Sequence, residues 1–183
     1  MKRLILVLVV LALVMGVMAT PVGAAKGNPG KELSFSGVAS GQGSFNFDPG
    51  AVAARCVSPA PPLAFAIATF TGSGHAKHLG RIDIVAEHCS HSDFTYSQGL
   101  LTITAANGDV LLATYTNGVS DFTNFPPDIG FTDEFTFVDG GTGRFAEASG
   151  GGVETGVADF FTDEFVVSME GVISYDASNR RRR

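Results

Sequence analysis

Basic side chains are scarce in this 183-residue chain, and their scarcity excludes one class of partner. Residues 26–176 contain 6 basic and 18 acidic side chains. Within 121–176, twelve acidic residues accompany a single basic one, Arg144. A surface of this charge repels the phosphate backbone, so we expect no nucleic-acid partner. The four arginines that end the chain have no other basic residues to support them, and they indicate a solvated, disordered tail over 177–183.

Long apolar runs are also missing, except near the N-terminus. One run, residues 4–17, follows Lys2 and Arg3 and is followed in turn by small residues. This order is typical of a signal peptide, here over residues 1–25. The run is short for a membrane span, so we expect no stable membrane span after cleavage. The sequence therefore predicts an exported protein, periplasmic or extracellular, whose single mature domain covers 26–176.

Cysteine occurs only at Cys56 and Cys89. An even number of cysteines in an exported chain predicts a disulfide between them, which would contribute about 3–4 kcal/mol. His88 and His91 flank Cys89, and such side chains are metal ligands. Because Cys89 already has a disulfide partner, we expect no metal and no other cofactor. A metal site on His88 and His91 is the alternative.

Helical periodicity is absent from the mature chain, and alternation of apolar and polar residues takes its place. The clearest example is a hairpin around Asn107-Gly108, a pair typical of tight turns. Glycine and proline separate the alternating stretches. Many short, evenly spaced strands predict an all-β fold, a single antiparallel barrel of about eight strands. A closed barrel has no exposed strand edges.

The stretch VDGGTGRFA, residues 138–146, contains the glycine spacing of a dinucleotide-binding loop. That interpretation requires a helix after Gly143. Three consecutive glycines at 150–152 instead interrupt the chain, and period-two alternation resumes after them. We therefore interpret the stretch as a hairpin whose glycines shape the turn, with Phe145 pointing to the core.

Three stretches resemble one family of barrels. Residues 138–150 resemble the GGTG-x-F-x-x-A-x-G motif of the allene oxide cyclase and dirigent proteins. Residues 72–81 and 104–109 resemble bacterial exported relatives of that barrel. The resemblance implies an eight-stranded antiparallel barrel with an apolar cavity. It also implies small apolar or phenolic ligands, handled without a metal or organic cofactor, because plant members act as cyclases or guide radical coupling.

The pentapeptide FTDEF occurs twice, at 131–135 and 161–165. In a regular strand, the two phenylalanines and the aspartate of each copy share one face, which we expect to be interior. These candidate ligand-binding residues are Phe131, Asp133, Phe135, Phe161, Asp163 and Phe165. A carboxyl group in an apolar cavity has a raised pKa and can act as an acid, a base or a ligand anchor. A bulge at the Asp-Glu pair, or a position at a wet barrel mouth, is the alternative without function.

The sequence as a whole favours a barrel that binds a small apolar or aromatic molecule over one that catalyses a reaction, and it leaves catalysis open. One alternative is a cofactor-free isomerase or cyclase with Asp133 and Asp163 as catalytic carboxylates. The other is a structural or surface-interaction protein that has no ligand. The three hypotheses differ in the barrel lumen, which is roomy in the first two and filled by side chains in the third.

Overall fold

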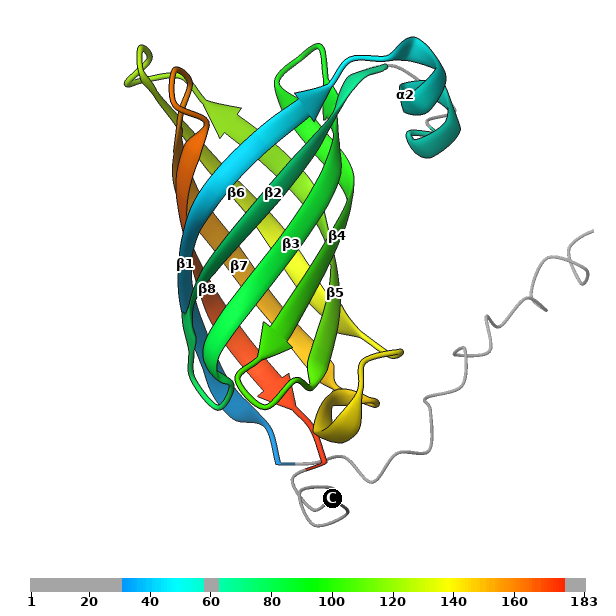
Figure 1. Cartoon of the computed structure of the whole chain (residues 1–183), viewed down its shortest axis with the longest axis vertical. Helices are drawn as coiled ribbons and strands as arrows, with labels where there is room; N and C mark the ends of the chain where they lie inside the picture. The colour runs from blue at the N-terminus through cyan, green and yellow to red at the C-terminus, as the bar shows by residue number, and fades with distance from the viewer. Residues whose placement is uncertain (1–30, 58–62, 177–183) are drawn as a thin grey trace, which may run out of the picture.

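Eight antiparallel strands close into a barrel in the computed structural model (Figure 1). The structure describes residues 31–57 and 63–176, so the predicted signal peptide and C-terminal tail lie outside the described residues. Each strand pairs with the next along the chain, and the last pairs with the first. The strands are β1 (Leu33–Asn46), β2 (Ala64–Ala76), β3 (Gly80–His91), β4 (Thr95–Ala105), β5 (Val110–Asp121), β6 (Asp128–Val138), β7 (Ser149–Asp159) and β8 (Glu164–Ser174). The predicted all-β, eight-stranded antiparallel barrel is confirmed.

Alternation along the strands decides which side chains face the barrel interior. In β1, Phe35 and Ala39 are buried, whereas Ser34 and Ser36 between and beside them are exposed. A shift of one residue in the pairing would move every apolar side chain to the outside, so this pattern fixes the register of the sheet.

One half of the barrel is filled by apolar side chains. This half ends at the short helix η1 (Gly143–Phe145), and we call that end the η1 end. The rings of Phe35, Phe135 and Phe137 contact one another, with centroids 5.1 to 5.9 Å apart. Large side chains with almost no solvent exposure surround them: Ile82, Ile103, Leu111, Met169 and Ile173. The barrel is therefore a packed core here and not a pore.

The glycine stretch closes the η1 end. Gly143 has a positive φ of 56°, and a Cβ added there would lie 2.1 Å from an oxygen of Asp109, so only glycine fits. The next residue, Arg144, is buried, and its Nη2 donates a hydrogen bond to the carbonyl oxygen of His78 at 2.7 Å. Phe145 is fully buried, as predicted. The three stretches that resemble the allene oxide cyclase barrels thus meet at this end, where they close the fold.

The opposite end carries the helix α2 (Pro49–Arg55), and we call it the α2 end (Figure 1). The predicted disulfide between Cys56 and Cys89 is present and joins the end of α2 to β3. Arg55 adds an ion pair to Glu87 with 2.6 Å between Nε and Oε1. These contacts hold α2 against the outer wall of the barrel. Within 31–57 and 63–176, no helix has both the length and the apolar character needed to cross a membrane.

Candidate functional site

The first FTDEF copy lies on β6 as predicted. Phe131, Asp133 and Phe135 point to the interior, and Asp133 is only 3% exposed. Burial of a carboxyl group among aromatic rings is costly unless it is hydrogen-bonded or protonated, so this residue is the natural starting point for a site.

The prediction for the second copy is wrong for two of its three residues. Phe161 is 71% exposed and Asp163 lies in a turn with a φ of 58°, so only Phe165 is interior. The reason is that oxygens of Asp159 accept hydrogen bonds from the backbone N–H groups of Phe161 and Asp163, at 2.8 and 3.0 Å. These bonds form a turn, and β8 begins only at Glu164.

Asp133 belongs to a group of polar side chains that face the lumen. Its Cα partner on β7 is Glu154, so the two carboxyl groups come from adjacent positions on neighbouring strands. The Tyr96 hydroxyl donates a hydrogen bond to Asp133 Oδ2 at 2.8 Å. Asp133 Oδ1 is buried and has no hydrogen-bond partner. We call the whole group the lumen cluster, and its members are His88, Tyr96, Tyr115, Asp133 and Glu154.

Two glycines allow the tyrosines to reach across the barrel wall. Tyr96 on β4 crosses β5 above Gly118, and a Cβ on Gly118 would lie 2.1 Å from the tyrosine ring. Tyr115 on β5 crosses β4 in the same way above Gly99, where an added Cβ would lie 2.3 Å from its ring. Each ring thus covers the glycine directly opposite it, an arrangement that stabilises a glycine within a sheet.

His88 joins the cluster through Tyr115, whose hydroxyl forms a hydrogen bond with His88 Nδ1 at 3.0 Å. The His88 ring also stacks on Tyr96, with centroids 4.2 Å apart. Burial, followed by electrostatic interactions with His91 and Arg55, lowers the pKa of His88 to about 3. The imidazole is therefore neutral at pH 7.

The two carboxyl groups of the lumen cluster have raised pKa values that lie close to neutral pH. Burial raises the pKa of Asp133 to about 6, although the Tyr96 hydrogen bond opposes this rise. Burial and then the charge of Asp133 raise the pKa of Glu154 to about 8. The groups titrate as a pair, so the cluster binds about one proton at pH 7. Burial also raises the pKa of both tyrosines, which therefore stay protonated and able to donate.

Solvent reaches the lumen from the α2 end. Phe70, Phe131, Glu154 and Ala158 point inward in this half of the barrel, yet all four keep partial exposure. An inward side chain in a closed barrel contacts water through the lumen, whereas most inward side chains of the η1 half are buried. The filled lumen thus describes the η1 half, and these four partly exposed side chains distinguish the α2 half from it.

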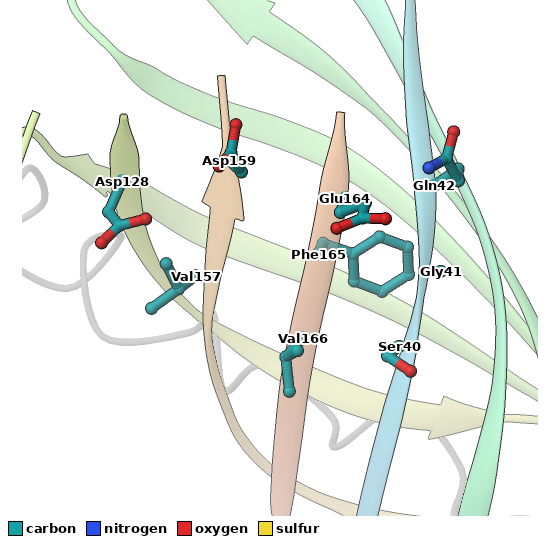
Figure 2. Close-up of a pocket in the computed structure, with 9 residues that line it drawn as sticks. All are labelled: Ser40, Gly41, Gln42, Asp128, Val157, Asp159, Glu164, Phe165 and Val166. Carbon is teal, nitrogen blue, oxygen red and sulfur yellow. The ribbon is translucent and has the colours of Figure 1, made fainter. Parts of the chain in front are cut away.

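A separate hollow of about 510 Å³ lies on the barrel wall beside β1, β7 and β8, near the α2 end (Figure 2). Its lining includes Gln42, Val157, Glu164 and Val166. None of the lumen cluster lines this hollow. The carboxyl pair of the lumen and this surface hollow are therefore in different places.

The alternative metal site on His88 and His91 lacks further ligands. His91 Nε2 contacts the hydroxyl of Ser97 at 2.8 Å, and Cys89 is committed to the disulfide. Among the residues that the structure describes, no group of three or more His, Cys, Asp or Glu side chains could hold a metal ion.

Comparison of the chain with protein-family models, curated proteins and solved structures finds no match.

Sequence reasoning missed Tyr96, Tyr115 and Glu154. Alternation around Glu154 predicted the wrong face, because Val153 is more apolar than Glu154 and would be expected to point inward. In the structure, Val153 and Thr155 point outward and Glu154 faces the lumen. One signal could have found it. Glycines lie two residues before and after Glu154, so it is the one long side chain on that stretch of the inner face.

Proposed function

We propose that the α2 half of the lumen binds a small molecule that has an apolar or aromatic body and a hydrogen-bonding group. The observation that carries the proposal is the buried oxygen Asp133 Oδ1, which has no partner. An unsatisfied buried acceptor costs about 1–3 kcal/mol, and a ligand hydroxyl or N–H group would offset this cost.

The surroundings of this oxygen fit such a ligand. Phe70, Phe131 and Phe165 present aromatic rings to the α2 half of the lumen, which suits an apolar or aromatic body. Glu154, whose pKa is raised, is protonated at neutral pH and can donate a hydrogen bond to a ligand carbonyl or hydroxyl oxygen. Because the η1 half is filled, the ligand enters and leaves through the α2 end.

A matched pair of variants tests this binding with 1-naphthol, a fluorescent aromatic molecule whose hydroxyl can donate a hydrogen bond to Asp133 Oδ1. Asp133→Asn and Asp163→Asn make the same chemical change, but Asp163 lies in an exposed turn. We expect 1-naphthol, followed by its fluorescence, to bind wild-type protein and Asp163→Asn equally, and to bind on the order of tenfold more weakly to Asp133→Asn. Equal binding by both variants would remove Asp133 from the site.

A cofactor-free isomerase or cyclase is the second candidate function. The favouring observation is that two adjacent carboxyl groups have pKa values near neutrality, as a general base and a general acid require. The ionised carboxylate would remove a proton from a carbon of the substrate, and the protonated one would return a proton at another position. Incubation of the bound small molecule in D₂O tests this. Deuterium incorporation that Glu154→Gln abolishes supports catalysis, and its absence in wild-type protein supports binding alone.

The proposal extends to family and location. We place the chain among exported relatives of the allene oxide cyclase and dirigent barrels, and three resembling stretches that meet at the η1 end support this. The disulfide supports export to an oxidising compartment, periplasmic or extracellular. A structural protein without ligand remains the third hypothesis, and the filled η1 half alone would suit it.

A further inference from the structure

Three turns at the α2 end share one sequence pattern. They are Asp93-Phe94-Thr95, Asp121-Phe122-Thr123 and Asp159-Phe160-Phe161-Thr162, in the β3–β4, β5–β6 and β7–β8 connections. In the first two, Asp Oδ1 accepts hydrogen bonds from the backbone N–H of the threonine at 3.1 and 2.9 Å, and from its hydroxyl at 2.7 and 2.6 Å. In the third, the Asp accepts two backbone N–H bonds. These bonds fix each turn so that its phenylalanines stay outside the barrel.

The exposed rings form a nearly continuous surface. From Phe94 through Phe122, Phe125 and Phe160 to Phe161, successive centroids lie 4.7, 5.9, 5.4 and 5.7 Å apart. The end of β1, the connection that contains α2 and the start of β2 add three more exposed rings, those of Phe45, Phe47 and Phe65. We call this set the phenylalanine crown, and its members are Phe45, Phe47, Phe65, Phe94, Phe122, Phe125, Phe160 and Phe161. Their exposed fractions range from 37% to 71%.

The phenylalanine crown has the contiguous exposed apolar surface that is typical of a recognition site. Scattered exposed apolar residues are ordinary, but contiguous exposed patches mark interaction sites. Here the aspartate hydrogen bonds hold the rings out in three separate turns, so their exposure is built into the fold. The η1 end offers no comparable set among the described residues, because its phenylalanines are buried.

The same end is strongly acidic. Seven carboxylates lie in or beside the connections there: Asp48, Asp93, Asp121, Asp128, Asp159, Asp163 and Glu164. Hydrogen bonds from Thr95 and Thr123 lower the pKa of Asp93 and Asp121, so both are charged at neutral pH. Within the part of the chain that the structure describes, the basic side chain of this end is Arg55, which is already paired with Glu87.

The exposed aromatic rings and the negative charge of the α2 end together indicate the chemistry of a partner. We propose that the α2 end docks a protein partner through a segment that carries arginine or lysine among apolar side chains. A guanidinium group stacks on phenylalanine faces and pairs with carboxylates, so it satisfies both components of the surface. Apolar side chains of the same segment cover the remaining rings. An anionic bilayer would be repelled by the carboxylates, and a zwitterionic one would leave them without partners.

The probe for this surface is a fluorescent peptide of alternating arginine and leucine, followed by anisotropy, with a glutamate–leucine peptide for comparison. The crown variant is Phe122→Ser with Phe160→Ser, and the charge variant is Asp163→Asn with Glu164→Gln. The control is Val38→Ser with Val85→Ser, which removes apolar side chains of similar exposure from the barrel wall. Thermal unfolding by circular dichroism checks that each variant is folded.

We expect the arginine–leucine peptide to bind wild-type protein and the wall control equally. Binding to the crown and charge variants should weaken on the order of tenfold. Added salt should weaken wild-type binding as well. Failure of the peptide to bind, equal binding of the glutamate–leucine peptide, or equal loss in the wall control would each overturn the proposal. Binding to phosphatidylcholine vesicles in preference to the peptide would replace it with a membrane surface.

Discussion

The two tyrosines of the lumen cluster each depend on a glycine that leaves room for the ring. Tyr96 reaches Asp133 because Gly118, on the strand between them, has no side chain. The polar contact therefore requires a glycine that contacts no ligand. Some of the glycines in this chain therefore provide the space in which aromatic rings cross a neighbouring strand.

Substitution of Gly118 tests this crossing. Gly118→Ala should destabilise the fold by about 1–3 kcal/mol, because the added methyl group overlaps the Tyr96 ring. Gly130→Ala is the matched control, since its Cβ would meet its nearest neighbour, Asp121, at an ordinary 3.4 Å. Urea unfolding measures both. In a Tyr96→Ala background the cost of Gly118→Ala should largely vanish, and an unchanged cost would show that the ring is not the obstacle.

The raised pKa of Glu154 predicts how stability depends on pH. The folded protein holds a proton on Glu154 up to about pH 8, whereas the unfolded chain loses it near the ordinary value of 4.5. The folded state therefore binds more protons in this window, and stability falls as pH rises. Below about pH 6.5 the buried, neutral His88 acts in the opposite direction, since its folded pKa is lowered.

Unfolding experiments between pH 6.5 and 8.5 isolate the carboxyl contribution. We expect wild-type protein to lose roughly 1–2 kcal/mol of unfolding free energy across this range. Glu154→Gln, which cannot ionise, should flatten the profile. A wild-type profile without slope, or an equal slope in the variant, would contradict the assignment of the titrating group to Glu154.

Among the elements, the strands were predictable from sequence and their irregularities were not. The first FTDEF copy lies on a regular strand, so alternation placed Asp133 correctly. The second copy begins in a turn that Asp159 stabilises, so the same pattern placed Asp163 wrongly. Inside β4, Tyr96 and Leu101 both point inward although their numbers differ by an odd count, because Gln98 has a φ of 54° and the register is irregular there. A period of two cannot reveal such irregularities.

The disulfide attaches the segment that contains α2 to the barrel. Its apolar residue Val52 packs with Ile67 and the cystine on the outer wall, separately from the main core. Replacement of Cys56 and Cys89 by serine should lower the unfolding free energy by about 3 kcal/mol, because the cross-link restricts the unfolded chain. The far-UV circular dichroism spectrum should stay that of a barrel. Loss of the β spectrum would show that the barrel itself depends on this attachment.

At the scale of the whole molecule, the two ends of the barrel have different roles. Seven of the 15 phenylalanines pack inside, and the other eight form the phenylalanine crown at the α2 end. The η1 end, closed by Arg144 and Phe145, stabilises the fold. The α2 end carries the crown, and the half of the lumen below it leads to the carboxyl pair at the middle of the barrel. The sequence predicted a barrel rich in phenylalanine, but this division depends on which turns end the strands.

The central claim is that the α2 half of the lumen holds a small molecule on Asp133. Native mass spectrometry of the protein purified from its own host tests it most directly, with Asp133→Asn and Asp163→Asn prepared in parallel. We predict one reproducible added mass on wild-type protein and on Asp163→Asn, and its loss from Asp133→Asn. Wild-type protein that is repeatedly free of any added mass would contradict the claim and favour the structural hypothesis.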